Sequence, residues 1–541
     1  MSSAAALARL TVVCSICIAV TALAARRYAR AKGGQASSNT SAAAPAKTCV
    51  PPVTLPDKGG SGRSPGGHWK HAAKATSETL TPRSAYARVE GAELRDRVVV
   101  AMVGLPARGK SYLSKAVVRY LNLIGCPARI FNSEEHRKTE VRRSSRVSDP
   151  GTDDAIATRD QVAMETLDEL FSWLRDATAT TWLATGASGC ACAIFDATNT
   201  TVARRQQIVA RCADERPPVR LIFLESICDD DELLKHNYRL KLAKTKTNKK
   251  EALEDFVGRV KKYEEAYERI EPAEGVSYLQ IHNAGQRLVA SGLAGYVSTR
   301  IVALLHAIHL EPRAIWLVLC GQTLNDTSDI VGGDSPLSAD GLEYARATVA
   351  LLARRIASWS TAEKLAGTQH SNPAIISGTL RRYSPMIDMM RKQIQPTSVT
   401  RLTRLNDLCA GELESVPAES LHTEHVAERE ARERDKLSYR FPGVGGESYQ
   451  DVIQRLLDTV LAIEQSRNNV VVVCDRAISR VLWSYLCGLE PANIPNLEVV
   501  PGLMELRRAH AGWTCTPLEV PEGAARTVGL AGDSCLGSLR A

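Results

Sequence analysis

One short segment limits what this chain can fold into more than any other. The sequence GLPARGKS, residues 104–111, matches the pattern G-x-x-x-x-G-K-[ST]. It follows the apolar run of residues 97–103 and precedes residues 112–123, which have helical character. A strand, a glycine-rich loop and a helix in this order form a loop whose backbone N–H groups and helix N-terminus bind phosphate oxygens. The segment therefore predicts a nucleotide-binding domain built on a parallel α/β sheet.

Two side chains of this loop have chemical roles in such a site. Lys110 would reach the outer phosphates of a nucleoside triphosphate, and the Ser111 hydroxyl would bind Mg²⁺. We therefore expect ATP together with Mg²⁺ at this loop.

A second motif follows another apolar run, residues 192–195. That run ends in Asp196, and an acid at the carboxyl end of a strand can lie beside the nucleotide loop. Asp196 could orient Mg²⁺ or take the proton of an attacking hydroxyl, and Arg204 or Arg205 could bind a substrate phosphate. The alternative is that this segment only caps the start of a helix. Residues 221–225 are a further strand candidate.

Length and composition place the chain among soluble globular proteins. Its 541 residues predict roughly two to four domains, and 44% hydrophobic with 24% charged residues is an ordinary balance. The net charge is +8, but the basic stretches lie beside the phosphate-binding motifs and lack interleaved aromatic residues, so no nucleic-acid partner is expected. The 14 cysteines have no paired metal-like spacing, which suits a reducing compartment.

The two ends of the chain differ from the rest. Residues 10–25 carry no charge and are followed by three arginines, which predicts that residues 1–30 anchor the chain in a membrane, with the remainder in the cytosol. A cleaved secretory signal and an organellar presequence are the alternatives. Residues 31–88 are rich in Ser, Gly, Ala and Pro and predict a flexible tether, and residues 522–541 predict a disordered tail.

The motifs resemble those of the bifunctional 6-phosphofructo-2-kinase/fructose-2,6-bisphosphatases. The matching segments, in the family's order, are GLPARGKS at 104–111, NLIGCP at 122–127, FN at 131–132, FDATNTT at 195–201, ESIC at 225–228, and EDF at 254–256 with Arg259 and Tyr263. The resemblance implies a P-loop kinase domain with a parallel sheet at residues 89–311. A histidine-phosphatase-like (phosphoglycerate-mutase-like) α/β domain would follow at residues 312–521.

For the first domain, the resemblance implies phosphoryl transfer from ATP to the 2-hydroxyl of fructose 6-phosphate, which gives fructose 2,6-bisphosphate. The residues implied in catalysis are Lys110, Asp196, Thr198, Lys241 and Cys228. Those implied to bind ATP are Gly104, Leu105, Pro106, Ala107, Arg108, Gly109, Lys110, Ser111, Tyr112 and Asn237, with Ser111 and Asp196 on Mg²⁺. Those implied to bind the sugar phosphate are Arg137, Arg159, Arg204, Arg259 and Tyr263.

Three of these assignments carry an alternative or a departure from the family. A buried thiol without a chemical role is the alternative for Cys228. The family's Tyr-Arg-Arg is His-Arg-Lys at residues 136–138. The segment after Asn237 is one residue short, which leaves Lys241 or Lys244 as the second lysine on ATP.

The second half lacks the histidines on which the family's phosphatase chemistry depends. That chemistry uses a nucleophilic histidine in an Arg-His-Gly sequence directly after a strand. Here residues 314–320 are followed by Gly-Gln-Thr, with Gln322 at the nucleophile's position. The second histidine is replaced by Asp475, whose charge would repel a phosphate. His370 lies before its strand rather than after it and is not expected to substitute.

Other landmarks of the phosphatase fold remain, so we expect a folded pseudophosphatase. Asp407 aligns with the family's acid/base glutamate, and Arg381 is the expected phosphate-binding arginine. Such a domain could be a packing and dimerisation module, which we favour and which would make the protein a homodimer. It could also bind a sugar phosphate and regulate the kinase.

Three functions are compatible with these features. The first is a 6-phosphofructo-2-kinase without bisphosphatase activity. The second is a membrane-tethered scaffold whose kinase has also decayed, and the third is a kinase for another small phosphorylated sugar or polyol. ATP turnover would exclude the second, and a substrate panel would separate the third from the first.

Overall fold

The computed structural model describes residues 96–133, 153–185, 190–242, 249–309, 313–365, 372–509 and 512–520. All of these residues belong to one compact unit, Ser77–Ala541. The predicted membrane anchor, the tether and the tail lie outside the described residues. Among the helices that are described, none is both long enough and apolar enough to cross a membrane.

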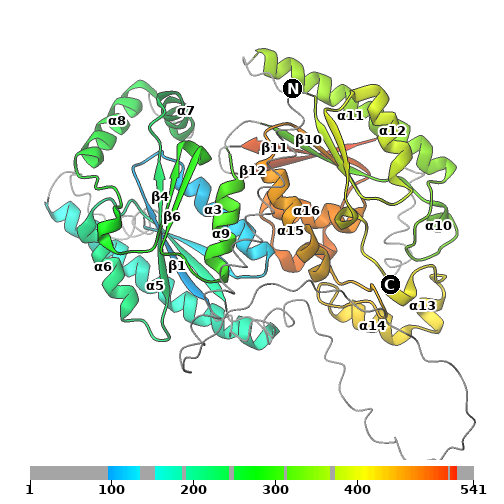
Figure 1. Ribbon diagram of the computed structural model, residues 1–541, viewed down its shortest axis with the longest axis horizontal. Helices are drawn as coiled ribbons and strands as arrows, with labels where there is room; N and C mark the ends of the chain where they lie inside the picture. Colours follow the sequence, from blue (N-terminus) through cyan, green and yellow to red (C-terminus); the bar gives the residue numbers. More distant parts are fainter. Residues whose placement is uncertain are drawn as a thin grey trace, which may run out of the picture. The chain divides into compact units, whose positions relative to one another are not determined.

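The first domain is built on a six-stranded sheet with the strand order β2-β3-β1-β4-β5-β6 (Figure 1). Its strands are β1 (Arg97–Val103), β2 (Ala128–Asn132), β3 (Ala191–Asp196), β4 (Arg220–Ile227), β5 (Tyr278–His282) and β6 (Arg287–Ser291). All neighbouring strands are parallel except β5 and β6. Every residue of β1 and β3 is buried, as the continuous apolar runs in the sequence predict for central parallel strands.

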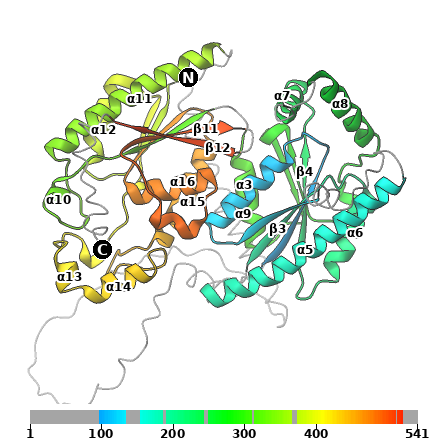
Figure 2. The same cartoon turned by 180° about the vertical axis from the view of Figure 1, so that it is seen from behind.

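Helices cover both faces of this sheet. They are α3 (Lys110–Leu123), α5 (Asp153–Thr185), α6 (Val202–Ala213), α7 (Asp231–Leu242), α8 (Lys249–Glu265) and α9 (Tyr296–Ala307), with short 3₁₀ turns η1 (Pro272–Glu274) and η2 (Asn283–Gly285). Alternate residues of β1 enter different cores: Val98 and Val100 pack with α3 and α9, whereas Val99 packs with α5 and α6. The opposed positions of these helix pairs are visible in Figure 2.

The second domain has its own six-stranded sheet, in the order β12-β11-β7-β10-β8-β9. Its strands are β7 (Ala314–Leu319), β8 (Ala374–Ser377), β9 (Ser398–Arg401), β10 (Val470–Cys474), β11 (Gly502–Ala509) and β12 (Gly512–Glu519). The four neighbouring strands β7, β10, β8 and β9 are parallel. Strands β11 and β12 are added at the β7 edge and are antiparallel. The predicted α/β class is therefore confirmed for both domains.

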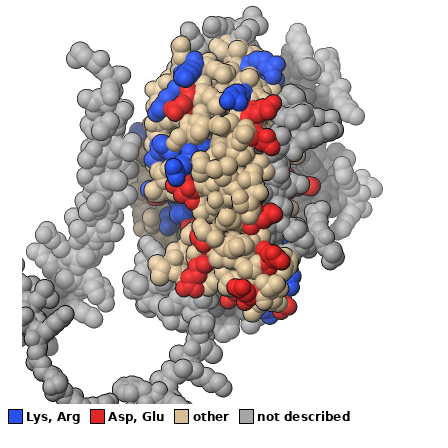
Figure 3. Space-filling model, turned by 90° about the vertical axis from the view of Figure 1, so that its right-hand side faces the viewer, with Lys and Arg blue, Asp and Glu red and all other residues tan. Residues whose placement is uncertain are grey.

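Helices also cover both faces of the second sheet. The second domain contains α10 (Leu324–Thr327), α11 (Ala339–Leu365), α12 (Tyr383–Ile394), α13 (Ser420–Thr423), α14 (Val426–Arg434), α15 (Tyr449–Gln465) and α16 (Arg476–Cys487), with 3₁₀ turns η3 (Thr403–Leu405), η4 (Gly411–Leu413) and η5 (Pro491–Asn496). Helices α11 and α12 pack on one face of the sheet, and α15 and α16 pack on the other. Figure 3 shows basic and acidic side chains on the same face of the molecule, and neither sign dominates its described part.

One hydrophobic core continues from the first domain into the second. It contains apolar residues of α3 and α9 together with apolar residues of α15 and α16. In that core α9 contacts α15, and α3 contacts both α16 and β12. The helix that begins at the nucleotide loop therefore lies against the phosphatase-like domain.

Candidate active site

The nucleotide loop connects the carboxyl end of β1 to α3, and two glycines determine its path. Gly104 has φ +132°, and a Cβ at this position would lie 2.6 Å from the carbonyl oxygen of Ser226 in β4. Gly109 has φ +87° and caps the N-terminus of α3. Both conformations favour glycine, because L side chains rarely adopt positive φ. The glycines of the sequence motif thus bring the loop close to β4 and turn it into the helix.

Lys110 and Ser111 lie at the first turn of α3, as the motif predicts. The Lys110 ammonium donates hydrogen bonds to the carbonyl oxygens of Gly104 and Leu105, at 2.7 and 2.8 Å, so it lies over the loop. The Ser111 hydroxyl donates to Oδ2 of Asp196 at 3.0 Å. A positive charge and an exposed hydroxyl therefore meet where phosphates would bind a helix N-terminus.

Asp196 ends β3 and is almost buried at the same edge of the sheet. Its Oδ2 also accepts a hydrogen bond from Nδ2 of Asn132 at 3.2 Å. A serine hydroxyl and a carboxylate within hydrogen-bond distance are the hard oxygen donors that Mg²⁺ takes beside nucleotide phosphates, so the residues present fit Mg²⁺. No chemical role for Asn132 was predicted from the sequence, although its place at the end of β2 puts it on the same sheet edge.

The segment after Asp196 is tied to the nucleotide loop by hydrogen bonds. The backbone N–H of Gly104 donates to the carbonyl oxygen of Thr198 at 3.0 Å. Asn199 has φ +45° and donates from Nδ2 to the carbonyl oxygen of Met102 at 2.8 Å. Thr201 caps α6 by accepting from the N–H of Arg204. Asp196 and Thr198 are therefore held beside the loop, and the predicted cap is present as well.

The other side of the loop is held by α7 and α8. Asn237 donates from Nδ2 to the carbonyl oxygen of Ala107 at 3.1 Å. The guanidinium of Arg108 donates to the Tyr238 hydroxyl and to Glu264, both at 3.2 Å. Arg108 and Asn237, both predicted to contact ATP, thus connect the loop to neighbouring helices.

Cys228 lies just after β4, close to this loop, and is buried. Burial raises the pKa of its thiol, although the backbone near Asp230 and the charge of Arg108 act in the opposite direction. The group is therefore a neutral thiol at neutral pH, which does not suit a nucleophile. The alternative of a buried apolar thiol fits the structure better.

The two arginines predicted as alternative ligands for the sugar phosphate have different environments in the structure. Arg205 is fully buried and donates to both carboxylate oxygens of Glu274, at 2.8 and 2.6 Å. Arg204 is only partly buried and contacts Gln207 at 3.3 Å, so it is the better candidate of the two. Tyr263 lies partly buried on α8.

Several predicted site residues cannot be compared with the structure. Lys241, Arg159 and Arg259 lie on α7, α5 and α8, but their side chains are outside the described part of the chain. Arg137 lies outside the described residues, as do Lys244, His370 and the His-Arg-Lys departure. Their roles remain predictions.

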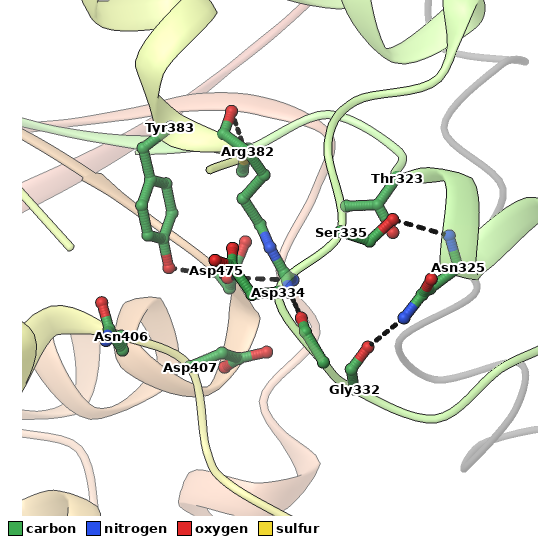
Figure 4. A network of polar contacts seen from close by, with 12 residues as sticks. Thr323, Asn325, Gly332, Asp334, Ser335, Arg382, Tyr383, Asn406, Asp407 and Asp475 are labelled. Atoms are coloured by element: carbon green, nitrogen blue, oxygen red, sulfur yellow. Dashed lines mark hydrogen bonds and ion pairs between the residues drawn. The ribbon is translucent and has the colours of Figure 1, made fainter. Parts of the chain in front are cut away.

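In the second domain, the residues at the histidine positions are held by their own neighbours. Gln322 follows β7, and its Oε1 accepts a hydrogen bond from the Ser338 hydroxyl at 3.1 Å. Asp475 precedes α16, and its Oδ2 accepts from the Tyr383 hydroxyl at 2.7 Å. The same oxygen lies 3.4 Å from the guanidinium of Arg382. Figure 4 shows Arg382 and Tyr383 both pointing toward Asp475.

The arginine in this pocket is Arg382 and not the predicted Arg381. Arg381 is exposed, and its backbone N–H donates to Asp334 at 2.7 Å. Arg382 is buried and also donates to the carbonyl oxygen of Gly333. The sequence contains both arginines in succession before α12, and only the local backbone direction decides which one enters the pocket. Tyr383 was missed for the same reason.

Asp407 lies close to Asp475 in this pocket (Figure 4). Its Oδ1 atom is buried and has no hydrogen-bond partner among the residues that the structure describes. Burial raises the pKa of Asp407 to about 7, and the charge of Asp475 adds to this effect, while Arg382 opposes it. Two carboxyl groups, those of Asp407 and Asp475, therefore lie close enough to influence each other's charge.

A nucleotide loop on a parallel sheet, followed by a second α/β domain with polar and charged side chains just after β7 and β10, defines a two-domain kinase and phosphatase architecture. The family described as 6-phosphofructo-2-kinase matches residues 88–312, and the histidine phosphatase superfamily (branch 1) matches residues 315–519.

Whole-chain relatives agree with these matches. "6-phosphofructo-2-kinase/fructose-2,6-bisphosphatase" of Caenorhabditis elegans is 30% identical over 470 residues, which cover 82% of this chain and 95% of that protein. "6-phosphofructo-2-kinase/fructose-2,6-bisphosphatase 3" of Rattus norvegicus is 31% identical over 74% of this chain and 68% of that protein. "6-phosphofructo-2-kinase 1" of Saccharomyces cerevisiae is 30% identical over 74% of this chain, but over only 49% of its own length. The chain belongs to the 6-phosphofructo-2-kinase/fructose-2,6-bisphosphatase family.

Proposed function

We propose that the chain transfers the γ-phosphoryl group of ATP to the 2-hydroxyl of fructose 6-phosphate and forms fructose 2,6-bisphosphate. The observation that carries the proposal is the cluster of Lys110, Ser111 and Asp196 at the start of α3, in a chain of this family. Such a site needs no covalent step, because phosphoryl transfer is promoted by positioning and by positive charge.

Each residue of this cluster has a separate task. Lys110 would stabilise the negative charge on the outer phosphates as the γ-phosphoryl group is transferred. Asp196, held by hydrogen bonds from Asn132 and Ser111, would orient the Mg²⁺ ion that accompanies the nucleotide, or it would take the proton of the sugar hydroxyl. Mg²⁺ on Ser111 and Asp196 would neutralise phosphate charge when bound. Arg204 is a candidate for binding the 6-phosphate.

The second domain is proposed to be inactive as a bisphosphatase. The amide nitrogen of Gln322 is not nucleophilic, so it cannot form the covalent phosphoenzyme that a histidine would form. Asp475 also places a carboxylate beside Arg382, 3.4 Å from its guanidinium. A phosphate would have to displace that carboxylate and would be repelled by it.

The decisive experiment incubates the full chain with Mg²⁺-ATP and fructose 6-phosphate and locates the new phosphate by NMR. Phosphate at carbon 2 is the expected result. Transfer to another phosphorylated sugar in a substrate panel, with none to fructose 6-phosphate, would favour the alternative kinase. Absence of transfer by folded, ATP-binding protein would favour a scaffold.

Two further features belong to the proposal. We propose that residues 1–30 anchor the chain in a membrane with both domains in the cytosol, on the basis of the uncharged run at residues 10–25. Membrane fractionation of the full chain, compared with a chain lacking these residues, tests the anchor. We also propose a homodimer in which the second domain has a structural role, and light scattering of the purified protein measures its mass.

A further inference from the structure

Helix α3 has the nucleotide residues at one end and a buried charge at the other. Lys110 begins the helix, and Arg119 lies nine residues further along it, about 13 Å away along the axis. The side chain of Arg119 is only 7% exposed, and its guanidinium lies 3.2 Å from the Glu464 carboxylate of α15. Glu464 belongs to the phosphatase-like domain and is itself fully buried. The helix is therefore joined to the second domain by a buried ion pair.

Glu464 is held on its own side of the interface by further donors. Arg313, just before β7, lies 3.3 Å from Oε2 of Glu464. The Tyr485 hydroxyl of α16 donates at 2.9 Å to Oε1, the oxygen that Arg119 also contacts. Burial would raise the pKa of Glu464, but Arg119, Arg313 and Arg508 outweigh burial and lower it. The carboxylate is thus ionised and fixed in place, and it defines where Arg119 can lie.

The neighbours of Arg119 leave its side chain little freedom. Its guanidinium carbon lies 5.1 Å from the ring centroid of Tyr485. Its aliphatic stem lies against Gly488, and its NH1 atom would be 3.4 Å from a Cβ at Gly512. These partners all belong to the second domain, so the C-terminal part of α3 packs against that domain.

A second contact from the same domain reaches the nucleotide end of the helix. Arg508 of β11 donates a hydrogen bond to the hydroxyl of Tyr112, and its guanidinium carbon lies 5.2 Å from the centroid of the Tyr112 ring. Tyr112 directly follows Ser111 on α3. The contacts of Tyr112 and Arg119 lie at separate points of α3, so together they fix the position of the helix along its axis and its rotation about that axis.

We propose that Glu464 and Arg508 are positioning residues for the nucleotide loop, and that the phosphatase-like domain is thereby required for ATP binding by the kinase domain. The proposal rests on the ATP-dependent activity proposed above. A small displacement of α3 would move the Lys110 ammonium and the Ser111 hydroxyl together, because both lie on its first turn. This role needs no phosphatase chemistry, which gives a reason for a folded second domain that lacks the histidines.

A matched control must break a similar buried ion pair without touching α3. Glu505 of β11 provides it, because this residue is 1% exposed in its side chain and pairs with Arg355 of α11 at 2.7 Å. It also accepts a hydrogen bond from Trp316 at 3.0 Å. Trp316 is fully buried on the side of the second sheet that α11 covers, opposite to Arg508, whereas the Arg355 side chain is 33% exposed. Loss of this carboxylate should destabilise the second domain without displacing the nucleotide loop.

The test compares Glu464→Gln, Arg508→Met and Glu505→Gln with the wild-type full chain. For Glu464→Gln we expect kcat/KM for ATP to fall by about 10²-fold, with a raised KM for ATP, while KM for fructose 6-phosphate changes by less than about twofold. Arg508→Met should change KM for ATP in the same direction, and it decides the question if Glu464→Gln does not fold. Glu505→Gln should keep the wild-type KM for ATP.

Direct measurement of ATP binding separates this proposal from the proposed function. If the wild type transfers no phosphate but binds ATP, weaker binding of ATP to Glu464→Gln, measured by calorimetry, still supports the positioning role. Wild-type ATP affinity in folded Glu464→Gln and Arg508→Met would overturn it. An equal loss of ATP affinity in Glu505→Gln would also overturn it, because the effect would then come from general destabilisation.

Discussion

The carboxylate of Asp475 lies 3.4 Å from the guanidinium of Arg382, directly before α16. Burial disfavours the charged form of Arg382, but Asp475 and Asp407 outweigh burial and raise the pKa of this arginine above its usual value. The guanidinium is therefore charged, and the carboxylate of Asp475 already neutralises that charge. This pairing adds to the missing nucleophile at Gln322 as a reason to expect no phosphatase activity from a domain that keeps its fold.

Asp475→His alone should leave the protein without hydrolysis of fructose 2,6-bisphosphate. The substitution removes the repelling carboxylate, but Gln322 still stands where the nucleophile is needed. Phosphate release from fructose 2,6-bisphosphate measures the outcome, and retained kinase activity serves as the control for folding. Hydrolysis by the wild type, or by the single variant, would contradict this account of the second domain.

Lys110→Met should reduce phosphoryl transfer by about 10²- to 10³-fold, because it removes the positive charge that the loop presents to the outer phosphates. The matched control is Lys115→Met, since Lys115 lies on the same helix and is exposed. Steady-state kinetics with ATP and fructose 6-phosphate compares the two variants. Equal activity in both would show that the Lys110 ammonium has no role in transfer.

Gly104→Ala should damage the nucleotide loop. The new Cβ would lie 2.6 Å from the Ser226 carbonyl oxygen, in a backbone conformation with φ +132°. We expect a loss of stability of roughly 1–3 kcal/mol and weaker ATP binding, because relief of the clash must shift the loop away from β4. Gly258→Ala is the control, because a Cβ there meets nothing within 4 Å. A Gly104→Ala protein with wild-type melting temperature and ATP affinity would be inconsistent with the loop geometry.

The sequence predicts those parts of the site that follow from strand order and local motifs. The loop and the first turn of α3 come directly from one motif. Asp196 could be placed beside that loop because both follow central parallel strands, whose carboxyl ends share one edge. In the structure the Ser111 hydroxyl donates a hydrogen bond to Oδ2 of Asp196 at 3.0 Å.

The parts that could not be predicted depend on directions and distances that no local pattern encodes. Arg381 and Arg382 are adjacent and chemically identical, and only the backbone before α12 decides which guanidinium reaches Asp475. Arg119 and Glu464 are 345 positions apart, so their pairing arises from the packing of two domains. In the sequence, Arg119 is one of several polar residues of α3, and nothing distinguishes it from a solvent-exposed arginine. Only its burial in the structure shows that it joins the two domains.

The pair of carboxyl groups in the second domain predicts a pH dependence of stability. Burial and Asp475 raise the pKa of Asp407 to about 7 in the folded protein, whereas an aspartate in an unfolded chain has a pKa of about 3.9. Between these two values the folded state binds more protons than the unfolded state, so stability falls as the pH rises from about 4 to about 7. The contribution is fully present below pH of about 4 and is lost above pH of about 7.

Asp407→Asn should remove this part of the pH dependence, because an amide stays neutral in the same pocket. At pH 8 the variant should exceed the wild type in stability by roughly 4 kcal/mol, because the pKa differs by about three units between the folded and unfolded states, and at pH 4 the two should be nearly equal. Asp458→Asn on α15 is the control, since the Asp458 side chain is 76% exposed and pairs with Arg404 at the surface. Calorimetric melting temperatures at both pH values measure the difference. If Asp407→Asn melted below the wild type at pH 8, Asp407 would have to be ionised and stabilised by Arg382, and the assignment of its proton would be wrong.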